Sequence, residues 1–168
     1  MKVICFIGYS GSGKTHQILN IIRLLDEKFN YKACVIKNIH EHPIDNIGKD
    51  SYRYSENGAA FSITRNKFNE TAIYIRNNLF IPELVNWIKK GPFPFHVLIM
   101  EGFRNTAFPT VLCVKEVSEI EEQLTDKVLM ISGRICERAS RRIIPGLTCP
   151  CFDIEKNFSE FIKIFNLP

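Results

Sequence analysis

The chain has 168 residues, of which 45% are hydrophobic and 24% are charged, and its formal net charge is +4. These values argue against a disordered chain, and the mild, dispersed positive charge suits an anionic ligand better than a nucleic acid. No run reaches the roughly 18 apolar residues of a membrane span, and the short apolar start lacks a cleavage site, so we expect a cytoplasmic protein with no membrane or nucleic-acid partner.

Apolar periodicity predicts strands that alternate with helices along the chain. Met1 to Ile7 is a continuous apolar run, which is typical of a strand buried on both faces. From Lys14 to Phe29 the apolar residues recur at helical spacing, and Tyr31 to Lys37 has the composition of a second strand. Further strands are expected at 59–64, 71–76, 95–100, 110–115, 127–131 and 149–154, and further helices at 49–57, 81–88 and 158–165.

This alternation predicts the fold class. Strands followed by helices imply an α/β fold with a mostly parallel central sheet and helices on both faces, the three-layer arrangement of P-loop NTPases. Because no linker, internal repeat or low-complexity segment interrupts the pattern, residues 1–168 are expected to form a single domain. The six cysteines include no C-x-x-C pair, so we expect reduced structural thiols rather than a metal site.

A glycine-rich segment carries the strongest functional signal. Residues 8–15 read Gly-Tyr-Ser-Gly-Ser-Gly-Lys-Thr and match the phosphate-loop pattern G-x-x-x-x-G-K-[ST] in full, between a predicted strand and a predicted helix. In this pattern, glycines let backbone N–H groups point at phosphate oxygens, Lys14 neutralises the β- and γ-phosphates, and the Thr15 hydroxyl suits Mg²⁺. Lys14 is the expected catalytic residue. The residues expected to contact the nucleotide are Ser10, Gly11, Ser12, Gly13, Lys14, Thr15 and His16.

A P-loop protein also needs a carboxylate at the end of a neighbouring strand to hold Mg²⁺ directly or through water. The apolar run 96–100 ends at Glu101, which Gly102 follows, so Glu101 is the expected metal residue together with Thr15. Asp50 competes for this role because it opens a predicted helix after a loop, although a carboxylate there also serves as a plain helix cap.

Several segments resemble, in the same order, the molybdopterin-guanine dinucleotide biosynthesis protein B family. The family's phosphate loop, G-x-S-G-x-G-K-T, is matched by residues 8–15. Its G-K-D-S helix start is matched by Gly48-Lys49-Asp50-Ser51, and its E-G-F/Y-[KR] strand end by Glu101-Gly102-Phe103-Arg104. A strand ending at Lys37 before a His-rich loop and a Pro-x-hydrophobic-Asp segment at 150–153 extend the similarity. Where many members carry an Asp near Ile131, this chain has Ser132-Gly133.

The resemblance implies a homodimeric P-loop protein that binds GTP with Mg²⁺ and has weak GTPase activity. Its implied role is to assist a partner protein, the molybdopterin guanylyltransferase that attaches GMP to molybdopterin. By the same resemblance, Lys49, Asp50 and Ser51 line the nucleotide site. The preference for GTP rests on the resemblance alone, because the guanine-reading N-K-x-D tetrad is absent from the sequence.

Two other functions stay open at the level of sequence. A small-molecule kinase or other P-loop phosphotransferase would need an Arg-bearing lid, and the basic run Arg134, Arg138, Arg141 and Arg142 is a candidate for one. A non-enzymatic, nucleotide-gated interaction module is the other. Since no water-positioning Gln or arginine finger is evident, slow intrinsic hydrolysis that depends on a partner or on dimerisation is expected.

Two further pairs of residues allow several interpretations. His40 and His42 suit a contact to nucleotide or a pterin phosphate, a metal ligand pair or a solvated loop. Phe103 and Arg104, just beyond Glu101, stand where a lid or a partner surface is expected.

Overall fold

The structure, a computed structural model, describes residues 1–137, 139 and 141–167, and the chain divides between two units. Unit 1 comprises Met1–Asn38 and Pro94–Pro168, and unit 2 comprises Ile39–Phe93. The expectation of a single domain stays a prediction.

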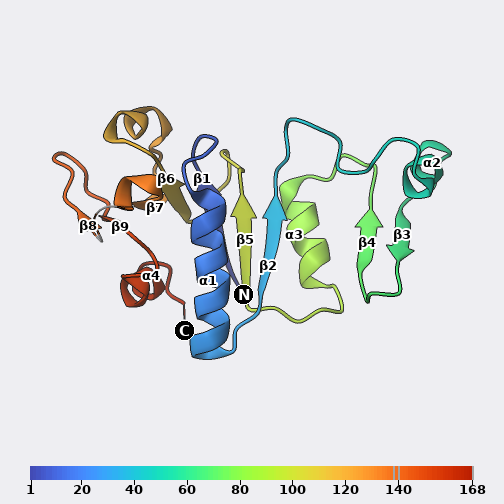
Figure 1. The fold of residues 1–168 in the computed structure, drawn as a ribbon, viewed down its shortest axis with the longest axis horizontal. Helices are drawn as coiled ribbons and strands as arrows, with labels where there is room; N and C mark the ends of the chain where they lie inside the picture. Colours follow the sequence, from blue (N-terminus) through green and yellow to red (C-terminus); the bar gives the residue numbers. More distant parts are fainter. Residues whose placement is uncertain (138, 140, 168) are drawn as a thin grey trace. The chain divides into compact units, whose positions relative to one another are not determined.

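Unit 1 is built around a seven-stranded sheet with the strand order β2-β5-β1-β6-β7-β9-β8 (Figure 1). Every neighbouring pair is parallel except β8 and β9, which are antiparallel. Parallel strands bring their carboxyl ends to the same edge of a sheet, which is where such folds bind ligands. The strands are β1 (Lys2–Ile7), β2 (Ala33–Lys37), β5 (Val97–Glu101), β6 (Thr110–Cys113), β7 (Val128–Ser132), β8 (Arg141–Arg142) and β9 (Cys151–Phe152).

Alternate residues of these strands enter two separate cores, as the two-residue period of a strand requires. On one face Ile4 and Phe6 pack with α1 (Lys14–Phe29) and α4 (Phe158–Ile164), whose Phe161 is fully buried. On the other face the core contains Ile7 with Ile135 and Cys136 of the 3₁₀ helix η3 (Arg134–Cys136). Ile120, which directly precedes the 3₁₀ helix η2 (Glu121–Gln123), belongs to the same core. Helical segments thus cover both faces of the sheet in unit 1.

Helix α1 follows the phosphate loop without a break. Gly13 is its N-cap, in a left-handed conformation, and the helix ends where Asn30 adopts φ of 53° and its backbone N–H returns to Asp26 O and Leu25 O. The apolar side chains at helical spacing, among them Ile18, Ile21 and Leu25, face the core. The predicted range of this helix is confirmed in full.

Unit 2 contains two helices and a hairpin. Helix α2 (Asp50–Glu56) precedes the antiparallel strands β3 (Ser62–Arg65) and β4 (Thr71–Tyr74), and α3 (Ile81–Lys89) follows them. The Glu83 carboxylate accepts the Phe80 backbone N–H at 3.0 Å and so caps the start of α3. Four large apolar side chains of the hairpin region are exposed: Phe61, Ile63, Phe68 and Ile73.

The predicted fold class, an α/β fold with a mostly parallel central sheet, is confirmed, with local differences in the short elements and in the bounds of some strands. Strand β3 begins at Ser62 rather than at residue 59, and the strand predicted at 149–154 is reduced to the β9 pair. Strand β8 was not predicted, and neither were the 3₁₀ helices, including η1 (Val117–Glu119). Among the described residues, no helix has both the length and the hydropathy to cross a bilayer.

Candidate functional site

The phosphate loop joins the end of β1 to the start of α1, at the carboxyl edge of the sheet in unit 1. Its first residue, Gly8, has φ of 142°, and a Cβ there would lie 2.0 Å from the carbonyl oxygen of Cys113 in β6. No side chain fits in that space, so glycine is required where the loop passes the neighbouring strand. The structure brings together, in this one loop, the predicted residues Ser10 to Thr15.

The Lys14 side chain folds back over the loop. Its Nζ donates to the carbonyl oxygens of Gly8 and Tyr9, each at 2.9 Å. Burial is the largest influence on the pKa of Lys14 and lowers it, Glu101 opposes that shift, and the positive charges of Arg104 and Lys37 reinforce it. The ammonium is therefore held among other cations, an environment that a phosphate chain would neutralise.

Thr15 and Glu101, the two residues predicted to hold the metal, are in direct contact, and their metal role stays a prediction. The Thr15 hydroxyl donates to Glu101 Oε1 at 2.9 Å, and Lys37 Nζ lies 3.5 Å from the same oxygen. Glu101 is 6% exposed, and the parallel register pairs it with Lys37 across β2 and β5. Sequence reasoning missed Lys37 as part of the site because the pairing of these two strands is not readable locally.

The oxygen atoms of this pair fit Mg²⁺, which prefers hard oxygen ligands and keeps several waters and phosphate oxygens in its shell. The described residues contain no group of three or more His, Cys, Asp or Glu side chains arranged to hold a metal. A hydroxyl and one carboxylate, completed by phosphate and water, are the donor set that a magnesium–nucleotide site requires.

Two further strand ends support the phosphate loop. After β7, the Arg134 backbone N–H donates to Ser12 O at 3.0 Å, and a Cβ on Gly133 would lie 2.4 Å from that oxygen. After β6, the Lys115 ammonium lies 3.6 Å from where a Cβ on Gly11 would stand. The cation of Lys115 thus lies beside the phosphate loop, and neither support was predicted from the sequence.

Tyr9, the second residue of the phosphate loop, connects the loop to two neighbouring segments. Its hydroxyl donates to Glu122 Oε2 at 2.6 Å, which is the main cause of the raised pKa of Tyr9. The Arg104 guanidinium stands 5.3 Å from the centre of the Tyr9 ring and donates to Gln123 Oε1 at 2.9 Å. The loop after Glu101, the phosphate loop and η2 therefore meet at one aromatic ring.

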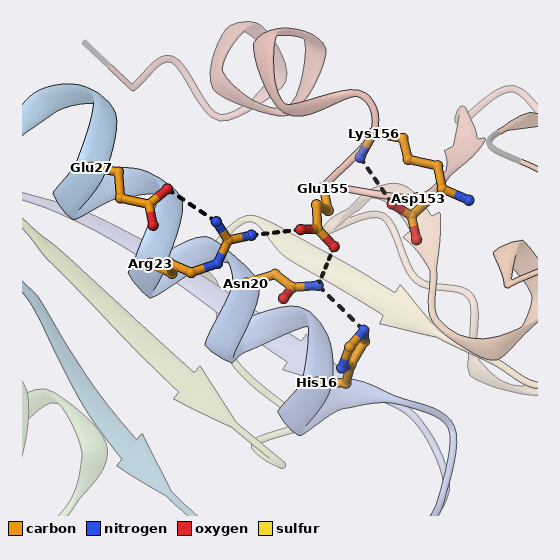
Figure 2. Close-up of polar contacts among 7 residues, drawn as sticks. All are labelled: His16, Asn20, Arg23, Glu27, Asp153, Glu155 and Lys156. Atoms are coloured by element: carbon orange, nitrogen blue, oxygen red, sulfur yellow. Dashed lines mark hydrogen bonds and ion pairs between the residues drawn. The ribbon is translucent and has the colours of Figure 1, made fainter.

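His16 lies on the first turn of α1, within a chain of polar side chains that Figure 2 shows. Asn20 Nδ2 lies 3.3 Å from His16 Nε2 and also donates to Glu155 Oε2 at 3.3 Å. Arg23 donates to Glu155 and also to Glu27, which lies farther along α1. These contacts link α1 to the turn after β9, where Asp153 accepts the Lys156 backbone N–H at 3.0 Å. The nucleotide role of His16 stays a prediction.

The remaining predicted residues around Gly48 and the two histidines belong to unit 2. Lys49 precedes α2, Asp50 begins it and forms an ion pair of 3.9 Å with Arg53, and Ser51 donates to Asp45 Oδ1 at 3.1 Å. Asp50 thus stands where a helix-capping carboxylate is expected, and its alternative role as a metal residue stays a prediction, as does the site role of Lys49 and Ser51. In the same unit His42 Nδ1 lies 3.0 Å from Pro43 O.

The basic run and the cysteines have local partners in unit 1. Arg134 pairs with Glu137 at 3.1 Å and Arg141 pairs with Glu160, whereas Arg138 lies outside the described residues. All six cysteines are free thiols, and the sulfurs of Cys136 and Cys151 lie 3.6 Å apart. The expected reduced thiols agree with this arrangement.

Three comparisons with known proteins bear on the identity of the chain. The sequence model of the MobB family, molybdopterin guanine dinucleotide synthesis protein B, matches residues 3–133. A protein of Methanocaldococcus jannaschii named as a molybdopterin-guanine dinucleotide biosynthesis adapter protein is 27% identical over 97% of this chain and 71% of its own length.

Solved structures share the fold. The crystal structure of Bacillus subtilis MobB superposes with a TM-score of 0.74 over 98% of both chains, at 20% identity. A MobB homologue from Bacillus stearothermophilus gives a TM-score of 0.66 over 99% of this chain and 97% of its own, at 15% identity. Since the family model covers well over half of the sequence, this chain belongs to the MobB family, whose members take part in molybdopterin guanine dinucleotide biosynthesis.

Proposed function

We propose that this protein binds GTP with Mg²⁺, hydrolyses it weakly, and assists a molybdopterin guanylyltransferase in attaching GMP to molybdopterin. The observation that carries the proposal is the geometry of the phosphate loop beside the Thr15–Glu101 pair. The family places the chain in the biosynthesis of a guanine dinucleotide, and this supports GTP as the ligand.

The loop supplies the electrostatic part of phosphate binding. Gly8 to Thr15 end at the N-terminus of a sixteen-residue helix, where unpaired backbone N–H groups favour an anion. Lys14 is already positioned within the loop by two carbonyl oxygens, and a phosphate chain offers its ammonium stronger, charged acceptors. Together with Lys37 and Lys115, Lys14 forms a cluster of positive charges in unit 1, and such a cluster suits a triphosphate.

The Thr15 hydroxyl and the Glu101 carboxylate would hold Mg²⁺, directly or through water. When bound, this ion neutralises charge on the phosphate oxygens as the bond between the β- and γ-phosphates breaks. In hydrolysis, water adds to the γ-phosphorus, GDP leaves, and inorganic phosphate and a proton are released. Lys14 stabilises the charge that develops on the bridging and γ-phosphate oxygens.

Dimerisation is part of the proposal. The hairpin β3–β4 of unit 2 has only two strands, and it exposes Ile63 and Ile73 on its surface together with Phe61 and Phe68 beside it. A two-stranded sheet with exposed apolar side chains is marginal by itself and is stabilised when a partner covers it. A second copy of this chain in the cytoplasm is the occupant that we propose for this surface.

Titration calorimetry with GTP and with ATP, in the presence of Mg²⁺, tests the base preference. The wild-type protein and Lys14→Ala are compared, and Lys156→Ala, an exposed lysine on the turn after β9, serves as a control. We expect the wild type and Lys156→Ala to prefer GTP, and Lys14→Ala to bind neither nucleotide.

Preference for ATP, with transfer of its γ-phosphate to an added small acceptor, would favour the phosphotransferase alternative. Tight binding of GTP without any phosphate release, even with a guanylyltransferase present, would favour the nucleotide-gated interaction module. Either result contradicts the proposed weak GTPase while leaving the family and the fold unchanged.

A further inference from the structure

Arg104 lies beside the phosphate loop, and the proposed function assigns no role to its positive charge. It lies three residues after Glu101, on the segment that leaves β5 at the carboxyl edge of the sheet. Its guanidinium stands over the ring of Tyr9, the second residue of the phosphate loop, and its positive charge acts on Lys14. A charge in this position is near where the phosphate chain of a bound nucleotide would lie.

The contacts that hold Arg104 in place are neutral. Tyr9 offers a ring face, and Gln123 offers an amide oxygen at 2.9 Å. Among the described residues no carboxylate pairs with Arg104, although Arg23, Arg134 and Arg141 each pair with a glutamate. A guanidinium has five N–H donors in a fork that matches phosphate oxygens, so a phosphate is a stronger partner than either neutral group.

The acceptor that Arg104 now uses belongs to a well-fixed segment. Gln123 is 3% exposed, and its amide nitrogen donates to Glu119 O at 2.8 Å. Tyr9 is tied independently to the same segment through Glu122. If Arg104 leaves Gln123, the segment 117–123 loses its link to the loop after Glu101 but keeps its link to the phosphate loop.

We propose that Arg104 binds the terminal phosphate of a bound nucleoside triphosphate, exchanging Gln123 for phosphate oxygens, and so distinguishes the triphosphate from the diphosphate state. This inference rests on the proposed function for the presence of a nucleotide, but not for the identity of its base. In hydrolysis the guanidinium stabilises charge on the γ-phosphate oxygens and takes no proton. The sequence showed no arginine finger, and this residue supplies an arginine from the same chain.

The test compares affinities for tri- and diphosphates in the full chain. Titration calorimetry with Mg²⁺ uses a non-hydrolysable GTP analogue, GDP, and the inorganic probes tripolyphosphate and pyrophosphate. For Arg104→Ala, we expect the affinity for both triphosphates to fall by roughly tenfold to a hundredfold, with affinity for the diphosphates changed by less than about twofold. Arg104→Lys keeps the charge but loses the fork, so an intermediate loss is expected.

Two matched variants separate this role from a structural one. Arg23→Ala removes an exposed arginine of the same unit that pairs with Glu27 and Glu155 and lies outside the phosphate loop, so both affinities should stay within about twofold of wild type. Gln123→Met removes the resting acceptor of Arg104 at similar volume, and the affinity for triphosphate should not fall. If the Arg104–Gln123 contact were purely structural, Gln123→Met would instead lose affinity for triphosphate, as Arg104→Ala does.

An equal loss of tri- and diphosphate affinity in Arg104→Ala and Arg104→Lys would overturn the proposal, and so would no loss in either. A wild type that prefers ATP contradicts the proposed function only, because the same comparison is then made with an ATP analogue and ADP. If Arg104→Ala does not melt cooperatively in circular dichroism, Arg104→Lys, which keeps the charge and the length of the side chain, decides the outcome.

Discussion

The hydroxyl of Thr15 donates to Glu101 Oε1 at 2.9 Å, although 86 positions separate the two residues in the chain. The contact exists because β1 and β5 pair in parallel with Phe6 opposite Glu101, which brings the end of β5 beside the start of α1. The sheet register therefore brings together the two oxygen atoms that we propose as magnesium ligands.

Replacement of Glu101 by Gln tests that assembly. The amide keeps the shape of the carboxylate but loses its charge, so we expect the Mg²⁺-dependent gain in GTP affinity to fall by about tenfold or more. Affinity measured with EDTA should stay near the wild-type value. Glu116→Gln, at an exposed position before η1, is the control and should match the wild type in both conditions. Equal losses with and without Mg²⁺ would exclude a metal role for Glu101.

Gly133→Ala tests the support that β7 gives to the phosphate loop. Gly133 has φ of 94°, and a Cβ there would lie 2.4 Å from Ser12 O, so the loop must shift. We expect a loss of about 2–4 kcal/mol in the free energy of unfolding, measured in urea, together with weaker nucleotide binding.

Gly146→Ala is the matched control for this substitution. Gly146 has a similar φ of 81°, but a Cβ there meets nothing within 4 Å. It should lose only the roughly 1 kcal/mol of a left-handed alanine and should bind nucleotide normally. Identical behaviour of the two variants would show that the contact with Ser12 does not hold the loop.

The helices and strands with a regular apolar pattern could be predicted from the sequence, because local periodicity determines them. The range 14–29 was predicted in full, and the strand predicted at 110–115 differs from Thr110–Cys113 only at its end. By contrast, the strand predicted at 149–154 pairs only over Cys151–Phe152. Pro150 has no N–H for the ladder, and Asp153 turns the chain by accepting the Lys156 N–H.

Other features depend on contacts between distant residues, which no local pattern contains. Arg141 and Arg142 form β8 only because β9 offers them an edge, and two adjacent arginines show no strand period. The phosphate loop is contiguous and was predicted, whereas Lys37 and Gly133 reach it through the sheet register. Their contribution becomes visible only once the strand order is known.

The buried Cys113 thiol predicts a loss of stability at alkaline pH. Burial is the main cause that raises its pKa from 9.0 to about 12 in the folded protein. The folded state then keeps the proton that the unfolded state releases, so its contribution to stability is present in full below pH 9 and is lost as the pH rises toward 12. At about pH 10.5 the loss from this group amounts to about 2 kcal/mol.

Urea unfolding of the wild type and of Cys113→Ala, measured from neutral pH upward, checks this effect. The alanine variant is expected to be less stable at neutral pH because of the cavity, but its stability should fall less steeply above pH 9. If stability fell equally steeply with pH in the two proteins, the prediction would be contradicted, because groups other than Cys113 would then cause the loss of stability at alkaline pH.

Helix α4 is expected to contribute much of its stabilising effect through Phe161. This side chain is fully buried in the core with α1, and its ring lies 4.9 Å from that of Phe165. Phe161→Ala should lower the free energy of unfolding by about 3–5 kcal/mol. Ile143→Ala, at a position that is 93% exposed in the same unit, should change it by less than about 0.5 kcal/mol. A small effect of Phe161→Ala would mean that α4 is only loosely attached.

The strand order has a consequence for synthesis of the protein on the ribosome. Strand β1 and the phosphate loop are synthesised before β5 and β6, the two sheet neighbours of β1, and before Gly133, which lies against the loop. An incomplete chain therefore carries the binding motif without the strands that give it shape. The nucleotide affinity that we propose should thus be acquired only after β7 and Gly133 have left the exit tunnel, and shorter products should not bind nucleotide.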